Sequence, residues 1–409
     1  MIHYSLRRAT LWNIAGYIYL LIASFIATPI LLKYLGIGYF SQYGLIIATL
    51  SLVSAINLGL PQAVTRELAR NHVFSRSRQS LWATSSVLFV MTGLVAALLA
   101  TVILYYLHIP YTWLAFIASI VLLNNLVAHY STLPQAEGHF GYYNAKTFIV
   151  GTGNTLLAAY IAYKGYGIHG ILIGHVATYF LTLLVLAYFS LKYFPRPRDG
   201  VASSTYVKSL AIFGMKNQVG TVIGQVEGQY SKYLLAAIAP LSLSAFFIAQ
   251  GLVYKIAGGI AQIASALYPA SARGNAGVGI APLYHRLQLG VFGAGLFGVA
   301  LYHYFGVSFL MWWLQSSELV GLVDQVMQVF VWYLAVLSLT PLSSTILDSH
   351  GRPELTSLYA FVTTAIEIMV AVALYSRLGL MAPVYAALIA SILTTPLLLY
   401  STERVLNVK

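Results

Sequence analysis

The sequence predicts an all-α integral membrane protein with twelve transmembrane helices arranged in two pseudo-symmetric six-helix lobes. Composition is the first reason: 59% of the 409 residues are hydrophobic and 8% are charged, more apolar surface than a soluble fold of this length can bury. The second is that the apolar runs are about 20 residues long, which suits helices and not the short alternating strands of a barrel. An internal repeat is the third.

Charge and cysteine content exclude several classes of protein. The formal net charge is +12, but the basic residues lie in short loops between apolar runs, so we expect a membrane protein without a nucleic-acid partner. Cysteine is absent, which excludes disulfides and thiolate chemistry. No cleavable signal pattern is evident, and we expect the first apolar run to be retained as a helix.

Twelve apolar segments give the helix count. They are residues 11–33, 38–60, 81–107, 111–134, 142–163, 168–192, 208–238, 242–268, 285–313, 320–346, 355–375 and 379–402. When alternate loops are assigned to opposite sides, sixteen Lys and Arg residues lie on one side and three on the other. Excess cation marks the cytoplasmic face, so both termini are predicted to be cytoplasmic.

The longest connection, 192–208, is polar, contains proline and lies midway along the chain. We therefore predict an N-terminal lobe, 1–197, and a C-terminal lobe, 198–409. The loops on the outer side are too short to form a folded catalytic domain.

The two halves also match in order and spacing. "EGHFGYYN" (137–144) follows the fourth predicted helix, and "SHGRPELT" (349–356) follows the tenth. Gly138 is 29 residues before Gly167, and Gly351 is 28 residues before Gly379. Such a repeat predicts two lobes of the same topology with a substrate path between them.

One predicted helix is unusually polar. Its stretch "KNQVGTVIGQVEGQYSK" (216–232) contains two lysines, one glutamate and three glutamines. At about 100° per residue the polar side chains occupy over half of the circumference. An ionised side chain facing hydrocarbon costs at least ~2.5 kcal/mol, so this arc must face protein or water. Gly220, Gly224 and Gly228 lie within the arc and leave room for a neighbouring helix or a bulky ligand.

The charges of this helix favour a cavity over a simple ion pair. Lys216 and Glu227 are roughly 16 Å apart along the helix and cannot pair directly, and Lys255 adds a cation on the next helix. A purely structural Lys–Glu pair beside a glycine packing stripe is the alternative. The excess of cations favours an anionic ligand such as pyrophosphate, and amides suit sugar hydroxyls. The candidate binding residues are Lys216, Lys255, Lys232, Gln225, Glu227 and Asn13.

Glu367 is the other acid deep within a predicted helix. It is a candidate coupling carboxylate, since intramembrane acids serve in proton relays. The favoured alternative is a neutral side chain that hydrogen-bonds to a neighbouring helix. His129 and His175 are interpreted as packing groups without metal-ligand spacing, so we expect neither a metal nor another cofactor.

Three segments carry a resemblance to a known family. The segment "SKYLLAAIAPLSLSAFFIAQGLVYKIAGGIAQIASALYPASARGN" (231–275) resembles the helix 7–8 region of polysaccharide flippases. "LGLPQAVTRELAR" (58–70) is similar to the end of their helix 2, and "HGRPELTSLYAFVT" (350–363) to the turn before helix 11. The chain thus resembles the O-antigen or exopolysaccharide (Wzx-like) flippases of the multidrug/oligosaccharidyl-lipid/polysaccharide exporter superfamily.

The resemblance implies a V-shaped, multidrug-exporter-like fold in the bacterial inner (cytoplasmic) membrane. It implies alternating access that moves an undecaprenyl-pyrophosphate-linked oligosaccharide of O-antigen, capsule or exopolysaccharide to the outer leaflet. Basic groups in the cavity would contact the pyrophosphate, and here they correspond to Lys216, Lys255 and Lys232. A polysaccharide polymerase or glycosyltransferases of the same pathway are the implied partners, beside the lipid bilayer.

Other functions fit less well. A cation- or proton-coupled multidrug antiporter of the same superfamily is the nearest alternative, but its cavity is expected to be dominated by carboxylates. A major-facilitator transporter would carry a Gly-x-x-x-Asp-Arg motif where "LPQAVTRELARNH" stands (60–72). A membrane glycosyltransferase or polymerase would need a larger outer loop, so we expect no enzymatic activity. The sequence shows no nucleotide-binding motif, so an ATP-driven pump is not expected.

Overall fold

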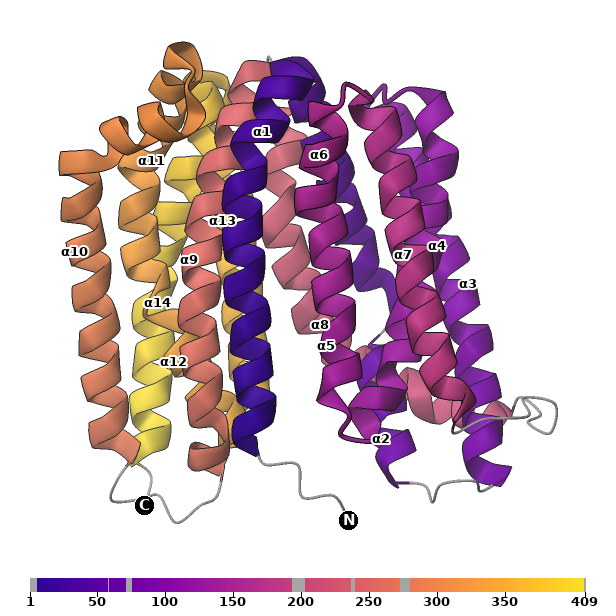
Figure 1. Ribbon diagram of the computed structural model, residues 1–409. Helices are drawn as coiled ribbons and strands as arrows, with labels where there is room; N and C mark the ends of the chain where they lie inside the picture. The colour runs from indigo at the N-terminus through magenta and orange to yellow at the C-terminus, as the bar shows by residue number, and fades with distance from the viewer. Residues whose placement is uncertain are drawn as a thin grey trace. The chain divides into compact units, whose positions relative to one another are not determined.

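The computed structural model describes residues 6–57, 59–70, 76–192, 203–236, 240–272 and 280–407. Within these ranges the chain is helical nearly throughout and contains no strand (Figure 1). The α-helices are α1 (Leu6–Ser54), α2 (Leu60–Arg70), α3 (Arg76–Tyr106), α4 (Tyr111–Ala136), α5 (Phe140–Thr152), α6 (Ala158–Tyr163), α7 (Gly167–Leu191), α8 (Ser204–Leu235), α9 (Pro240–Ala272), α10 (Ile280–Leu314), α11 (Ser317–Leu337), α12 (Thr340–Ser349), α13 (Pro353–Leu378) and α14 (Ala382–Asn407). This confirms the predicted all-α membrane fold.

Each predicted transmembrane segment corresponds to helix in the structure. α1 contains the first two, which meet at a kink where Gly36 has φ 73°. α5 and α6 form one predicted segment, joined by a π-helical turn over Gly153–Leu157. Another segment is divided into α11 and α12 at residues 338–339.

Eight segments of the described chain are long and apolar enough to cross a bilayer. Three of them contain two helices each: Ala15–Asn57, which is kinked at Gly36, Ser317–Ser349, with α11 and α12, and Pro353–Asn407, with α13 and α14.

The end of the second predicted helix differs from expectation. The sequence pattern extends that helix to residue 60, but α1 ends at Ser54 and a 3-10 turn, Ala55–Asn57, follows. The chain then turns at Gly59 (φ 66°) into α2. A Cβ at Gly59 would lie 2.4 Å from the carbonyl oxygen of Gly214, so only glycine fits this close approach. The apolar run continues through the break, and for this reason hydropathy did not locate it.

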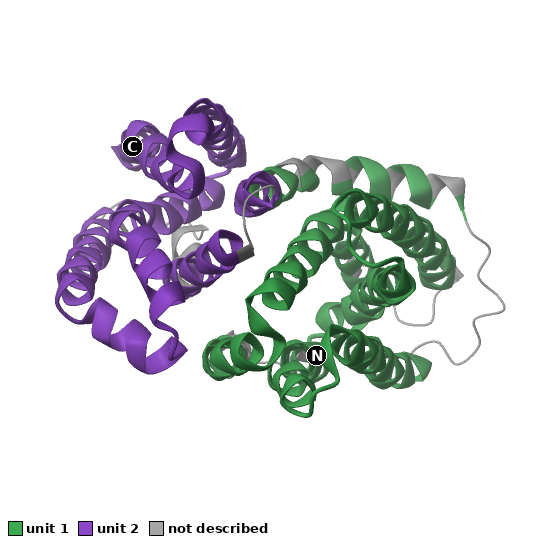
Figure 2. Cartoon of the chain, turned by 90° about the horizontal axis from the view of Figure 1, so that it is seen from above, with its two compact units in different colours: residues 1–225 green, residues 226–409 purple. Residues whose placement is uncertain are grey.

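The chain divides into two compact units, residues 1–225 and residues 226–409 (Figure 2). The division falls within α8 and not in the 192–208 connection. The predicted lobe boundary at 197/198 stays a prediction.

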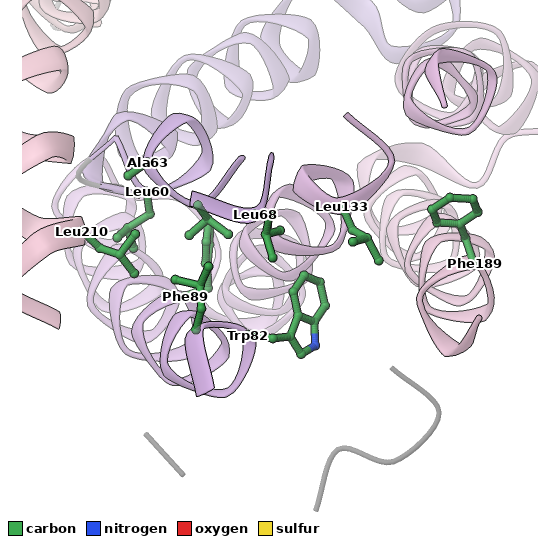
Figure 3. Packing of buried hydrophobic residues seen from close by; sticks show 10 residues of the cluster. Leu60, Ala63, Leu68, Trp82, Phe89, Leu133, Phe189 and Leu210 are labelled. Carbon is green, nitrogen blue, oxygen red and sulfur yellow. The ribbon is translucent and has the colours of Figure 1, made fainter. Parts of the chain in front are cut away.

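A buried apolar cluster holds α2 within unit 1 (Figure 3). Side chains from α2, α3, α4, α7 and α8 contribute to it: Leu60, Ala63, Val64, Leu68, Leu81, Trp82, Phe89, Leu133, Phe189 and Leu210. α2 has apolar residues on one face only, and this face is the one that packs into the cluster. Burial of large side chains is the main favourable contribution to such packing, about 1.5–3 kcal/mol each.

The glycines aligned in the internal repeat share their backbone conformation. Gly138 has φ 72° and Gly351 has φ 75°. Both end a helix in the same way: the N–H of His139 donates to the carbonyl of Pro134 (2.8 Å), and the N–H of Arg352 donates to that of Leu347 (2.9 Å). This is the Schellman motif, which requires a left-handed residue at the glycine position.

Candidate functional site

Two of the sequence-predicted site residues have side chains outside the described residues. Lys216 lies in α8 and Asn13 in α1. Their positions on these helices are as predicted, but the structure gives no contacts for their side chains.

Gln225 and the α8 residues before it belong to unit 1. The Oγ of Ser51 donates to the Oε1 of Gln225 (2.8 Å), and the amide of Gln218 donates to the carbonyl of Ala55. The polar face of α8 therefore contacts the end of α1 and the 3-10 turn that follows. These bonds answer why a membrane helix accepts so many glutamines, since each amide shown here has a polar partner within the protein.

The glycine row of α8 does not support a close helix packing stripe at every position. A Cβ at Gly224 would meet no heavy atom within 4 Å, and one at Gly228 would lie 3.8 Å from the Tyr254 side chain. Gly224 therefore borders open space, as expected if these glycines leave room for a ligand and are not in close contact with a neighbouring helix.

Lys232 and Lys255 are both half-buried in unit 2. The Nζ of Lys232 donates to the Oε1 of Gln229 (2.7 Å) and lies 5.1 Å from the centroid of the Phe247 ring. No ion pair with a described acid is shown for Lys232, and the amide oxygen and the aromatic ring both interact favourably with its ammonium group. Lys255 is located one helix further along, on α9.

The structure brings Glu227 and Glu367 into one polar cluster within unit 2. Glu367 on α13 is 4% exposed, and its Oε1 accepts a hydrogen bond from the hydroxyl of Tyr230 (3.0 Å). Glu227, one turn before Tyr230 on α8, accepts a bond from the Oγ1 of Thr364 (3.4 Å). Neither carboxylate forms an ion pair with a described Lys or Arg residue. The two acids predicted separately therefore lie together, with hydroxyl groups as their partners.

The aromatic part of this cluster was not predicted from the sequence. Tyr254 on α9 is hydrogen-bonded to Tyr333 on α11 and to Gln250. Tyr333 and Gln250 are buried. The chain contains 31 tyrosines, so residue type alone did not distinguish Tyr254 and Tyr333 from the others. Their signal is positional: Tyr254 and Tyr333 lie within the apolar segments Leu241–Gln262 and Ser317–Ser349, away from the ends of these segments, where tyrosine is enriched at membrane interfaces.

His129 and His175 make contacts with aromatic side chains, although His175 also borders a cavity. His129 lies against Trp82 and Phe89, with ring centroids 4.1 and 5.0 Å apart. The Nε2 of His175 is 3.1 Å from the hydroxyl of Tyr43. Within the described part of the chain, no group of three or more His, Cys, Asp or Glu residues is arranged to hold a metal ion.

Comparison with solved structures identifies the fold. The chain is similar to an inward-facing multidrug resistance MATE family transporter of the MOP superfamily (TM-score 0.74, 14% identity, 100% of this chain and 97% of that one). It is also similar to the lipid II flippase MurJ in an inward closed conformation (0.77, 13%, 96% and 87%). A third similar structure is a MOP superfamily transporter from Pyrococcus furiosus (0.64, 13%, 98% and 95%). At 13–14% sequence identity, these similarities establish the fold and nothing further about this chain.

Sequence comparison identifies the family. No individual curated protein matches the chain. The family model described as "Polysaccharide biosynthesis protein" matches residues 6–275, which is more than half of the chain. With a membrane-spanning, all-helical fold like that of MOP superfamily transporters, the protein belongs to the polysaccharide biosynthesis protein family.

Proposed function

We propose that the protein is a flippase that moves a polyprenyl-pyrophosphate-linked oligosaccharide from the cytoplasmic to the outer leaflet by alternating access. The observation that carries this proposal is the combination of a polysaccharide-biosynthesis family match with the fold of membrane transporters. A member of a sugar-polymer pathway with such a fold has an evident task, because a lipid-linked sugar made inside must cross the bilayer. The cargo is an O-antigen, capsule or exopolysaccharide repeat unit.

The intramembrane lysines supply the binding chemistry in this proposal. Lys216, Lys232 and Lys255 contact the pyrophosphate as compact positive charges in a region of low dielectric constant. Gln225, Glu227 and Asn13 contact sugar hydroxyls, to which amide and carboxylate groups form hydrogen bonds. The protein works in the bacterial cytoplasmic membrane with both termini on the cytoplasmic side, beside a polymerase or glycosyltransferases of the same pathway, and has no enzymatic activity of its own.

A cation- or proton-coupled multidrug antiporter is the second candidate. The observation that favours it is the pair of carboxylates, Glu227 and Glu367, in a cluster of tyrosines without a described basic partner. A cation or proton bound there would stabilise the cluster. An organic cation would be the expected cargo in that case.

Export in a deletion strain distinguishes the two candidates. Cells that lack the protein are expected to accumulate lipid-linked oligosaccharide on the inner leaflet and to lose surface polysaccharide. Lys216→Ala and Lys255→Ala are expected to fail to restore export at normal protein levels, whereas Lys164→Ala, an exposed lysine of unit 1, restores it. Normal surface polysaccharide in the deletion strain, together with increased sensitivity to cationic drugs, would favour the antiporter.

A further inference from the structure

Unit 1 contains two adjoining cavities, and none of the predicted site residues whose side chains the structure describes lines either of them. One has a volume of about 210 Å³ and the other about 300 Å³. Both are lined by Ser54, Asn124 and Asn125, so they share one wall. Ligand sites in proteins begin at about 300 Å³, and a space of this size suits a single sugar ring better than an oligosaccharide.

Side-chain carboxamides dominate the polar lining of the two cavities. They come from the turn after α1, from α2, from α4 and from the π-helical turn between α5 and α6: Asn57, Gln62, Asn124, Asn125, Gln135 and Asn154. Hydroxyl groups lie between them, and no Asp or Glu lines either cavity in the described part of the chain. Each carboxamide offers both donors and an acceptor, as each sugar hydroxyl does. The lining therefore matches a polyhydroxylated ligand.

Much of this hydrogen-bonding capacity is unused within the described residues. The structure shows no side-chain hydrogen bond for Asn124 or Gln62. Asn57 uses its oxygen to accept from the N–H of Gly59 (3.1 Å), which leaves its amino group available. The Nδ1 of His175, a residue 2% exposed in the wall of the smaller cavity, likewise has no partner. Asn57 and Asn124 are half-buried and Gln62 is exposed, so water or a ligand can reach them, and a partner is expected for the buried Nδ1 of His175.

Lys146 on α5 is the single cation in the lining among the described residues. It is half-buried, its Nζ lies 5.9 Å from the centroid of the Tyr143 ring, and it forms no ion pair with a described acid. A cation that is partly removed from water and lacks an acid favours an anionic partner. The carboxamides are thus suited to hydrogen bonds with hydroxyl groups, and Lys146 is suited to pair with one negative charge.

We propose that this cavity pair of unit 1 binds one sugar ring that carries or adjoins an anionic group, with Lys146 in contact with the anion. The proposal rests on the proposed flippase function, since it names the part of the cargo that unit 1 recognises. The anion has two sources: a carboxylate of a uronic acid, or the phosphate at C1 that joins the sugar to its lipid.

Direct binding to the purified full-length protein tests the proposal. The probes are a panel of hexuronic acids, the corresponding hexose 1-phosphates, the neutral hexoses and inorganic phosphate, measured by calorimetry in nanodiscs. Lys146→Met is expected to weaken binding of the anionic sugars at least 10-fold, and Lys146→Arg to retain it within a few-fold. Asn124→Leu is expected to weaken anionic and neutral sugars alike. Lys164→Met is the matched control, an exposed lysine of the same unit, and should not change binding.

The panel separates the outcomes. Stronger binding of hexuronic acids identifies the carboxylate as the anion, and stronger binding of hexose 1-phosphates identifies the phosphate. If no probe binds, or if Lys146→Met binds all probes as the wild type does, the cavity is a water-filled void and the proposal is wrong. If the wild-type protein exports polysaccharide but binds no probe, this site alone is refuted. Sugar binding in a protein that exports only drugs refutes the flippase function and leaves the site.

Discussion

The ion pair between Arg78 and Glu137 allows the sharpest test of how unit 1 is held together. Arg78 lies at the start of α3 with 2% of its side chain exposed, and its guanidinium contacts the Oε1 of Glu137 at the end of α4, which is 18% exposed. Glu137→Ala removes the acid and leaves a buried guanidinium without this partner. Breaking a fully buried ion pair costs about 3–5 kcal/mol, and we expect a loss of about 2–3 kcal/mol here because Glu137 is partly exposed and Arg78 has further interactions in the protein.

The reverse substitution is expected to cost less. Arg78→Met leaves the carboxylate of Glu137, which water can reach, and its loss should be about 1–2 kcal/mol. The double variant Arg78→Met/Glu137→Leu removes both charges and should fall within about 1 kcal/mol of the wild type. This order of stabilities follows from the burial of the two partners.

Reversible unfolding in mixed micelles, titrated with a denaturing detergent and followed by circular dichroism, measures these free energies. Glu403→Ala is the matched control, since Glu403 pairs with His285 (2.7 Å) in an exposed position and should contribute less than about 1 kcal/mol. If Glu137→Ala is no more destabilising than Glu403→Ala, the reasoning from burial is wrong.

Four further substitutions test other parts of the structure. Gly59→Ala combines a left-handed φ with a Cβ 2.4 Å from the Gly214 carbonyl oxygen, whereas Gly36→Ala has the left-handed φ with no atom within 4 Å. Gly36→Ala should cost about 1–3 kcal/mol, since φ 73° and ψ 163° are a combination that only glycine adopts readily, and Gly59→Ala should cost clearly more in the same unfolding titration; equal losses would contradict the close contact. Phe89→Ala removes a fully buried ring and should cost about 3–5 kcal/mol, and a loss below about 1 kcal/mol would place Phe89 outside the core. Glu367→Gln should leave polysaccharide export unchanged, because glutamine accepts the same hydrogen bond; export that no longer responds to a proton uncoupler in this variant would instead assign Glu367 a coupling role.

The transmembrane helices were predictable from the sequence because lipid requires each spanning segment to be apolar and to form its backbone hydrogen bonds within the segment. The same reasoning singled out α8, whose glutamines, glutamate and lysines could not face hydrocarbon. The breaks within helices were harder to predict. The kink at Gly36, the turn at Gly59 and the π-helical turn at Gly153 lie inside continuous apolar runs, where hydropathy has no contrast.

Some of the site residues were evident in the sequence, whereas their grouping in space was not. Glu227 and Glu367 were noticed individually, since an acid in an apolar segment is conspicuous in any sequence. Their shared cluster with Tyr230 was not predictable, because 140 residues separate the two acids and no periodicity connects them. The carboxamides and Lys146 of unit 1 were not selected, as each is ordinary when taken alone.

The sequence by itself determined the class of this protein: a chain that is 59% hydrophobic, with long apolar runs and basic loops, has to be a helical membrane protein. Only the tertiary structure decided which polar groups meet, namely the two acids with their tyrosines in unit 2 and the amides around Lys146 in unit 1. The physical reason is that transfer of each segment into lipid depends on local composition, whereas the partners of a buried polar group depend on which helices pack side by side.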